Sequence, residues 1–463
     1  MKESVESVKM SRILYNIMLA TFVALFIGCD SLPVMDTVVD MSPVEQLGSG
    51  EVEHTLVMYL LANNNLETSI YHNALDAEAG MVGALPSTRL VIYLDRRNET
   101  KLYEVRYLPY GDGDEYIRYC KVLKTYPDQI STKPEVMRGV LEDVKRLAPS
   151  KSYGLVCSGH GTGWFPKPSS GTSYDKQKVA PLWGEGEYVF NYDRYVPETK
   201  AMGYDLVELE DGSLVRTDES FISSAEIVEG LSPIHFDYIL FDACFMSSVE
   251  FLYDLRHSTD YVIASPVEVL GVGMPYKEVV RNLMTTNHNL TTLCDTIMDV
   301  YMRDDKFTAT KSLALALIDC SYLEELADAV ADVYDSVSKG DYKSTLKDRI
   351  KLSEIQMLDR MIPAAFHDMD DYVYAMAGGN TPQMQHFLEV LDKVVVKSVH
   401  TEDIYSYGYS SDGFAVGYAN IEYKVNGVMD LCGISTYVPS RDLPVTLEYY
   451  FQTEWAKKVY SEE

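Results

Sequence analysis

The sequence predicts an α/β fold in which helices cover both faces of a mostly parallel sheet, followed by a C-terminal helical and α/β extension. Two observations predict this core. Continuous apolar runs, typical of strands buried on both faces, alternate with helical segments over residues 51–285. Strands that alternate with helices pair in parallel, because each helix carries the chain back across the sheet. Helical patterns dominate residues 286–463, where we expect the extension.

The first elements after residue 50 are three strands, a helix and a fourth strand. The segment ANNNLE follows the first strand and offers asparagine as a helix cap. The turn YGDGDEY at 110–116 carries acids that could hold calcium, although a solvated turn is the simpler explanation. The strands are expected at residues 55–61, 89–95, 101–108 and 153–161, and the helix at 133–147.

Residues 163 to about 216 differ from the rest, since they are rich in glycine, proline, serine and tyrosine. We interpret them as a long irregular insertion that contains a hairpin around Asp211-Gly212. The core pattern resumes with a helix from Thr217 to about Leu231, for which the residues TDES provide a cap. A strand at 236–244, a helix from about 247 and a strand at 260–266 complete the core.

In the C-terminal region the sequence predicts helices, interrupted by one strand, SLALALID, at 312–319. From about residue 405 the pattern changes to short alternating strands, which end in a final helix near 447–459. The earlier helices of this region are predicted at 290–302, 323–338 and 384–396.

The charge of the chain limits its partners. With 70 acidic against 40 basic residues, the formal net charge is −30. Such a surface repels nucleic acid phosphates and anionic lipid, so we expect it to bind neither. It would attract basic peptides, although an acidic composition commonly serves solubility alone.

The N-terminus resembles a bacterial lipoprotein signal. Lys2, Lys9 and Arg12 precede an apolar stretch at 13–27, which ends in the motif FIGC at Cys29. The resemblance implies a signal peptide at 1–28, lipidation of Cys29 and a tether over 29–50. We therefore expect an exported lipoprotein at the periplasmic face or the cell surface, with the outer membrane as its site. The alternative is an uncleaved anchor, for which about 15 apolar residues are short.

The other cysteines form neither a CxxC motif nor a zinc-type cluster with histidine. Most lie in apolar surroundings, so we interpret them as core thiols, with disulfides as the alternative in an exported protein. Cys157 lies inside a predicted strand and is expected to be packed and inert. These cysteines are Cys120, Cys157, Cys244, Cys294, Cys320 and Cys432.

Cys244 is treated separately because two predicted strands end in reactive side chains. YGLVCSGHG leads to His160, and FDYILFDAC leads to Cys244. Since the carboxyl ends of parallel strands meet at one edge, a thiol and an imidazole would lie within reach of each other. That pairing activates a cysteine nucleophile. The alternatives are a turn histidine and a core thiol.

The surroundings of both residues favour catalysis. Gly159 and Gly161 flank the histidine and let a substrate approach the backbone closely. The helix that begins near residue 247 would direct its positive end toward Cys244 and favour the thiolate. The backbone N–H groups of Gly161 and Cys244 could form an oxyanion hole.

These motifs resemble the clostripain family of cysteine peptidases, which share a caspase-like fold with caspases, legumains and gingipains. The resemblance rests on SGHG and FDAC, on VMYLLANNNLE near the start and on CGISTYVP near the end, and it extends from residue 51 to the C-terminus. It implies a peptidase with His160 as general base and acid, Cys244 as nucleophile and a thioester intermediate. It implies peptide or protein substrates and no required cofactor, but it leaves calcium open, because some relatives use it.

The resemblance also places an acid before the nucleophile, here Asp242, in a pocket for Arg or Lys on the amino side of the cleaved bond. In a strand Asp242 and Cys244 would point to the same side. The alternative is that Asp242 caps the next helix or orients His160. Glu268 is a second candidate pocket acid at a less certain alignment, and Asn63 stands where the family often has aspartate.

Two further expectations follow from the resemblance. Relatives with this fold are often activated by cleavage, so we expect self-cleavage in the insertion, at Lys176 or Lys178, with an active chain that stays uncut as the alternative. The alternative function is a catalytically silent surface lipoprotein that binds peptides or glycans. A serine hydrolase is not indicated, since the sequence has no GxSxG motif.

Overall fold

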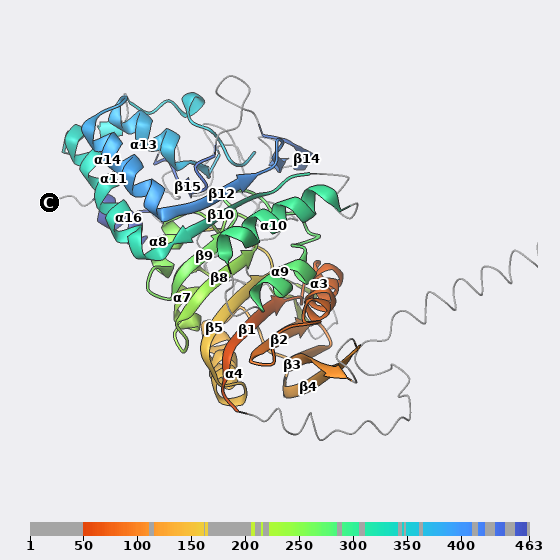
Figure 1. Ribbon diagram of the computed structural model, residues 1–463. Helices are drawn as coiled ribbons and strands as arrows, with labels where there is room; N and C mark the ends of the chain where they lie inside the picture. Colours follow the sequence, from red (N-terminus) through yellow and green to blue (C-terminus); the bar gives the residue numbers. More distant parts are fainter. Residues whose placement is uncertain are drawn as a thin grey trace, which may run out of the picture. The chain divides into compact units, whose positions relative to one another are not determined.

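The computed structural model (Figure 1) describes most of the chain after residue 49. Ser49–Glu463 form one compact unit. The expected signal peptide, Cys29 and most of the tether lie outside the described residues, as do Lys176 and Lys178. The described residues are 50–110, 115–161, 163–164, 205–208, 214–215, 222–284, 289–304, 311–340, 345–346, 349–360, 364–409, 415–421, 431–439 and 450–460.

A nine-stranded sheet, in the order β12-β10-β9-β8-β5-β1-β2-β3-β4, forms the centre of the described structure (Figure 1). The five inner strands β9, β8, β5, β1 and β2 run parallel, and antiparallel strands extend both edges. The strands are β1 (Val52–Leu61), β2 (Thr88–Arg96), β3 (Glu99–Tyr110), β4 (Glu115–Tyr126), β5 (Ser150–Ser158), β8 (Phe236–Asp242), β9 (Thr259–Ala264), β10 (Ala314–Asp319) and β12 (Val395–His400). The predicted mostly parallel sheet is confirmed.

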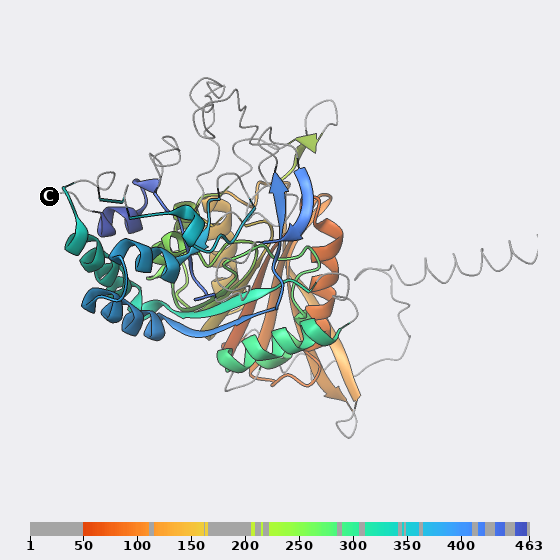
Figure 2. The ribbon, with the colours of Figure 1, turned by 90° about the horizontal axis from the view of Figure 1, so that it is seen from above.

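Helices cover both faces of this sheet (Figures 1 and 2). On one face α3 (Glu67–Gly80) packs on α9 (Tyr276–Leu283), and α9 packs on α10 (Leu290–Arg303). On the other face α4 (Pro134–Leu147) packs on α7 (Ser224–Leu231), which contacts α8 (Val249–Leu255). Crossover connections between parallel strands are right-handed. The connection from β1 to β2 and those from β5 to β8 and β9 run in opposite directions along the sheet, so their helices lie on opposite faces.

The C-terminal region combines helices with further strands, as expected. In Figure 1 its helices gather beyond β10 and β12, which extend the same sheet although they follow the predicted boundary at 285/286. The helices are α11 (Leu323–Val337), α13 (Met369–Ala377), α14 (Pro382–Val394) and α16 (Glu454–Val459), with short 3-10 helices η4 (Cys320–Tyr322) and η5 (Leu352–Glu354). Two-stranded pairs join β11 (His367–Asp368) to β15 (Ser435–Thr436), β13 (Tyr405–Tyr409) to β14 (Ala415–Asn420), and β6 (Val207–Glu208) to β7 (Leu214–Val215).

Two predicted boundaries are corrected. The helix expected from Thr217 begins at Ser224, because Ser223 and Glu226 form a capping box that starts it there. The last helix in the described residues, α16, begins at Glu454, where Thr453 caps it, and Tyr450 before it is also helical; the start expected near residue 447 lies outside the described part. Strand β8 ends at Asp242, so Cys244 lies in the following turn.

The hairpin around Asp211-Gly212 is supported by the antiparallel pairing of β6 and β7, although residues 209–213 are outside the described part. Residues 111–114 of the acidic turn also lie outside it. None of the helices in the described part of the chain has the length and apolar character that a membrane span requires.

Candidate active site

Cys244 lies in the turn that follows β8, and none of its surface is exposed. Its Sγ accepts a hydrogen bond from the amide of Val269 at 3.1 Å and lies 3.6 Å from the carbonyl oxygen of the same residue, to which the thiol can donate. Val269 belongs to the loop between β9 and α9. The thiol is therefore held between the ends of two neighbouring parallel strands.

The residue after the thiol has an uncommon backbone conformation. Phe245 has φ of 59°, in the left-handed region that costs a residue other than glycine about 1–2 kcal/mol. Its amide donates to the Val267 carbonyl at 3.0 Å, and its ring stacks on Phe366 with centroids 4.3 Å apart. These contacts, one of them from the C-terminal region, hold the strained turn that presents Cys244.

His160 follows β5, the strand beside β8. The pairing of Ser158 with Asp242 brings the ends of these two strands to the same level. The imidazole is 1% exposed, and its Nε2 lies 2.7 Å from Oδ1 of Asn65 in the turn after β1. The histidine is therefore at the carboxyl edge of the sheet, where the order of the strands predicted it.

Gly161 brings the histidine turn against the cysteine turn. A Cβ atom at Gly161 would lie 2.3 Å from the carbonyl oxygen and 2.6 Å from the amide nitrogen of Cys244. Real side chains cannot approach backbone so closely, so only glycine allows this contact. The backbones of residues 161 and 244 therefore touch, and His160 is the immediate neighbour of that contact.

Asp242 is fully buried at the end of β8. Its carboxylate accepts hydrogen bonds from the hydroxyl of Ser158 at 3.0 Å and from the phenol of Tyr276 at 2.8 Å. A Cβ at Gly273 would lie 2.9 Å from the same carboxylate, so the loop before α9 passes directly over it. The carboxylate thus lies below the loop that also contacts Cys244.

Glu268 is in that loop, next to the Val269 backbone that holds the thiol. It is 2% exposed and accepts a hydrogen bond from the hydroxyl of Ser406 at 2.7 Å. Ser406 belongs to β13, so this acid links the loop to the C-terminal region.

Two other positions named from the sequence, Cys157 and Asn63, are seen directly. Cys157 is buried in β5, and burial raises the pKa of its thiol, as expected of a packed cysteine. Asn63 pairs with the backbone of Leu206, near the end of the insertion.

The six cysteines from Cys120 onward are all free thiols. Within the described ranges, no three histidine, cysteine, aspartate or glutamate side chains are grouped to hold a metal ion.

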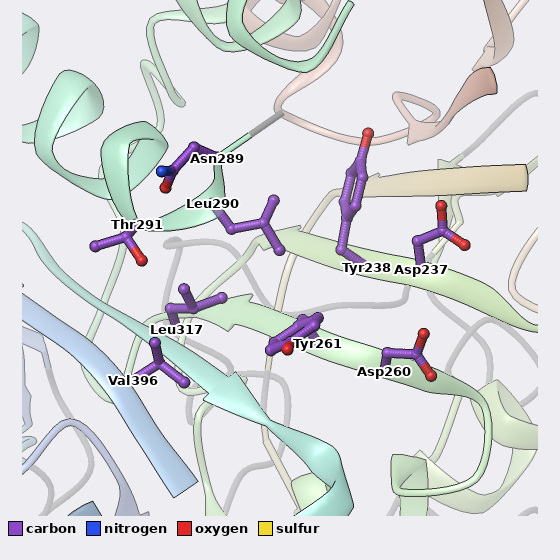
Figure 3. Close-up of a pocket in the computed structure, with 9 residues that line it drawn as sticks. All are labelled: Asp237, Tyr238, Asp260, Tyr261, Asn289, Leu290, Thr291, Leu317 and Val396. Carbon is purple, nitrogen blue, oxygen red and sulfur yellow. The ribbon is translucent and has the colours of Figure 1, made fainter. Parts of the chain in front are cut away.

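A pocket of about 490 Å³ lies elsewhere on the sheet (Figure 3). Asp237 and Asp260 line it from the amino ends of β8 and β9, whereas Cys244 follows the carboxyl end of β8. Figure 3 also shows Tyr261, Leu317 and Val396 around this pocket. It is therefore separate from the candidate active site.

Sequence reasoning missed Asn65, Phe245 and Tyr276. The sequence indicates Asn65 only as part of a helix cap, although its place after a parallel strand is a signal that identifies it as a residue of this edge. Tyr276 opens a helix 34 residues after Asp242, and no local pattern connects the two. The strain at Phe245 has no sequence signal, because nothing about phenylalanine favours a positive φ.

The thiol turn and the imidazole turn thus meet in backbone contact at the ends of two adjacent parallel strands. The chain belongs to the clostripain family, whose sequence model matches residues 172–462. This range contains Cys244, while His160 precedes it. The chain is thus a clostripain-like cysteine peptidase. A search of curated proteins found no match.

Solved structures show the same fold. An inactive zymogen C11 protease from Parabacteroides distasonis is 24% identical with a TM-score of 0.67, over 89% of this chain and 99% of that one. A secreted C11 cysteine protease from Bacteroides thetaiotaomicron, in complex with an irreversible peptide inhibitor, is 24% identical with a TM-score of 0.66, over 88% and 98%. The structure of iotapain, a secreted C11 cysteine protease from the same organism, is 25% identical with a TM-score of 0.65, over 89% and 100%.

Proposed function

We propose that this peptidase is an exported, lipid-anchored endopeptidase that cleaves after Arg or Lys through a dyad of Cys244 and His160. The main support for this dyad is the backbone contact between Gly161 and Cys244, because it brings the turn of the imidazole against the turn of the thiol. Cys157, the other cysteine of these two strand segments, lies within β5 and does not follow its end.

In the proposed reaction the Cys244 sulfur attacks the carbonyl carbon of the scissile peptide bond, and His160 takes the thiol proton. The carbon–nitrogen bond then breaks, and the imidazolium returns the proton to the leaving amine. Water, deprotonated by His160, hydrolyses the thioester and regenerates the thiol. The tetrahedral oxyanions form where the N–H groups of Gly161 and Cys244 could donate to them.

The proposed preference for Arg and Lys rests on Asp242. A buried carboxylate costs free energy unless it is hydrogen-bonded or paired, and here two neutral hydroxyls satisfy part of it. A guanidinium or ammonium would provide charge-assisted hydrogen bonds, and a guanidinium can provide two in parallel. We therefore expect Arg to be cleaved at least as well as Lys, with Glu268 as a second acid near this pocket.

Both dyad residues are almost inaccessible in the full chain, with Cys244 fully buried and His160 1% exposed. A substrate cannot reach a thiol in that state. We propose that the full chain is a precursor and that self-cleavage at Lys176 or Lys178 opens the site. This explains the burial without requiring a silent protein.

The proposed membrane anchor rests on the sequence before residue 30 alone, with Cys29 as the lipidated residue and the outer membrane as the expected location. Several acyl chains on one residue would hold the protein firmly on a membrane. Replacement of Cys29 by Ser should release the protein from the membrane fraction. Retention of Cys29→Ser in that fraction would reject lipidation there.

Labelling by a peptide electrophile tests the dyad. An electrophile that carries Arg or Lys should modify Cys244, and His160→Ala should slow the modification strongly while leaving the fold intact. A protein that binds such peptides but is never modified would instead support the silent alternative, a surface lipoprotein that binds peptides or glycans.

A further inference from the structure

The amide oxygen of Asn65 lies 2.7 Å from Nε2 of His160. Because an amide oxygen can only accept a hydrogen bond, the ring nitrogen that faces it carries the hydrogen. In a neutral imidazole the other nitrogen, Nδ1, is then the atom that accepts a proton. The contact with Asn65 therefore selects one tautomer of His160.

The turn around Asn65 is fixed on both sides. The side chain of Asn64 donates to the carbonyl of Leu61 at 3.0 Å and accepts from the amide of Leu66 at 2.9 Å. Leu66 is buried and immediately precedes α3. Asn65 itself is exposed, so the turn, and not packing, sets the direction of its side chain.

A second pair of hydrogen bonds fastens the same turn to the end of the insertion. The amide of Leu206 donates to the carbonyl of Asn63 at 2.9 Å, and the Asn63 side chain donates to the carbonyl of Leu206 at 3.1 Å. The neighbouring Asp205 is buried and accepts from the amide of Ser131. Each of the three consecutive asparagines thus has a separate contact: residue 63 with the insertion, 64 with the turn and 65 with the histidine.

We infer that Asn65 is a positioning residue for the peptidase reaction, holding His160 in the tautomer whose Nδ1 takes the proton of Cys244. When the imidazolium forms, its Nε2–H donates a stronger, charge-assisted hydrogen bond to the same amide oxygen. Asn65 therefore acts twice, by selecting the tautomer and by stabilising the charged ring. The inference rests on the proposed dyad and adds a third residue to it.

Kinetics of Asn65 variants test this role. In Asn65→Ala, kcat should fall about 10- to 100-fold, the loss of a hydrogen bond to a charged group, while KM changes little. Asn65→Asp keeps an acceptor oxygen at the same distance and should recover most of kcat. The matched control is Asn380→Ala, which removes an exposed asparagine before α14, far along the chain from the site, and should keep the wild-type kcat.

NMR of the histidine side chains needs no turnover, so it tests the inference even if Asn65→Ala folds poorly. The chain has nine histidines, so selective ¹⁵N-histidine labelling can resolve them, and His160→Gln identifies the signal of interest. The Nε2–H tautomer is expected in the wild type, with a shift of the Nε2 signal in Asn65→Asp. The Nδ1–H tautomer in the wild type would overturn the inference.

The inference and the proposed function fail in different ways. If Asn65→Ala keeps the wild-type kcat while Cys244→Ala and His160→Ala are inactive, the dyad stands and the role of Asn65 is rejected. If Cys244→Ala or His160→Ala remains active, the dyad itself is wrong, whatever Asn65→Ala does. An equal fall of kcat in Asn65→Ala and Asn65→Asp would mean that the residue only maintains the turn.

Discussion

The phenol of Tyr276 donates a hydrogen bond of 2.8 Å to the carboxylate of Asp242. Tyr276 opens α9 and Asp242 closes β8, so the bond fastens a helix to the strand that leads to Cys244. Burial, reinforced by the neighbouring carboxylate, raises the pKa of Tyr276 well above its usual value. The phenol therefore stays protonated and keeps donating. This contact makes the proposed pocket testable from both partners.

Replacement of Asp242 by Asn should sharply reduce cleavage after Arg and Lys. The variant keeps the shape of the side chain but loses the charge, which removes a charge-assisted pair worth on the order of 2 kcal/mol or more. Cleavage rates on matched peptides with Arg, Lys or an uncharged residue before the scissile bond measure this loss. A small uncharged electrophile should still modify Cys244.

Tyr276→Phe is the matched control for Asp242, because it removes one hydrogen bond to the carboxylate and leaves the charge. Its effect on Arg and Lys substrates should be clearly smaller than that of Asp242→Asn. A wild type that prefers Asp, Asn or an apolar residue would show that Asp242 does not form the pocket, even if the dyad is correct.

Gly161→Ala should abolish activity. The added Cβ would meet the Cys244 backbone at 2.3 Å, so the two turns must separate. Gly139→Ala in α4 is the control, since a Cβ there meets nothing within 4 Å. The control should keep full activity and gain up to about 1 kcal/mol of stability, because alanine favours the helix. Full activity in Gly161→Ala would show that the contact between the turns is not needed.

Glu250 should make stability depend on pH. It is fully buried on α8 and accepts hydrogen bonds from the amide of Tyr437 and the hydroxyl of Thr436. Burial raises its pKa to about 7. Because the folded protein then binds this proton more tightly than the unfolded chain, the stabilisation is complete below pH 4.5. It is lost as the pH rises toward 7, at about 1.4 kcal/mol per pH unit.

Glu250→Gln isolates this dependence, since it removes the titration and preserves the acceptor oxygen. Urea unfolding midpoints measured from pH 4.5 to 7.5 should fall more steeply for the wild type than for Glu250→Gln. Parallel curves for the two proteins would contradict the assigned pKa shift.

The sequence predicted the parts of the fold that depend on local pattern. The apolar runs located β1, β2, β5, β8 and β9, because strands buried on both faces carry continuous apolar residues. Their alternation with helices then placed His160 and Cys244 at one edge. The start of α7 was predicted seven residues early, since the TDES pattern competes with the capping box at Ser223, which the structure uses.

Contacts between distant segments could not be predicted in the same way. The loop of Val269 holds the Cys244 thiol, and Phe366 from the C-terminal region stacks on Phe245. Both contacts depend on how whole elements pack, and neither segment has a composition that indicates it. The contact of Asn65 with His160 also depends on β1 lying beside β5 in the sheet, which the local pattern of residues alone does not give.

Self-cleavage should occur at Lys176 or Lys178. Intact mass spectrometry of the purified wild type should show two fragments, whereas Cys244→Ala should remain whole because it lacks the nucleophile. A variant that keeps Cys244 but has both lysines replaced by Ala should be cut more slowly, or at another site. A wild-type chain that stays as whole as that of Cys244→Ala would rule out self-cleavage.

The central claim is that Cys244 is the nucleophile. The most direct measurement compares peptidase activity of wild type, Cys244→Ala and Cys157→Ala on a peptide with Arg before the scissile bond, with circular dichroism to confirm folding. We predict that Cys244→Ala is folded and inactive, since a small side chain in a turn contributes little packing, and that Cys157→Ala remains active. Activity retained in Cys244→Ala but lost in Cys157→Ala would contradict the assignment.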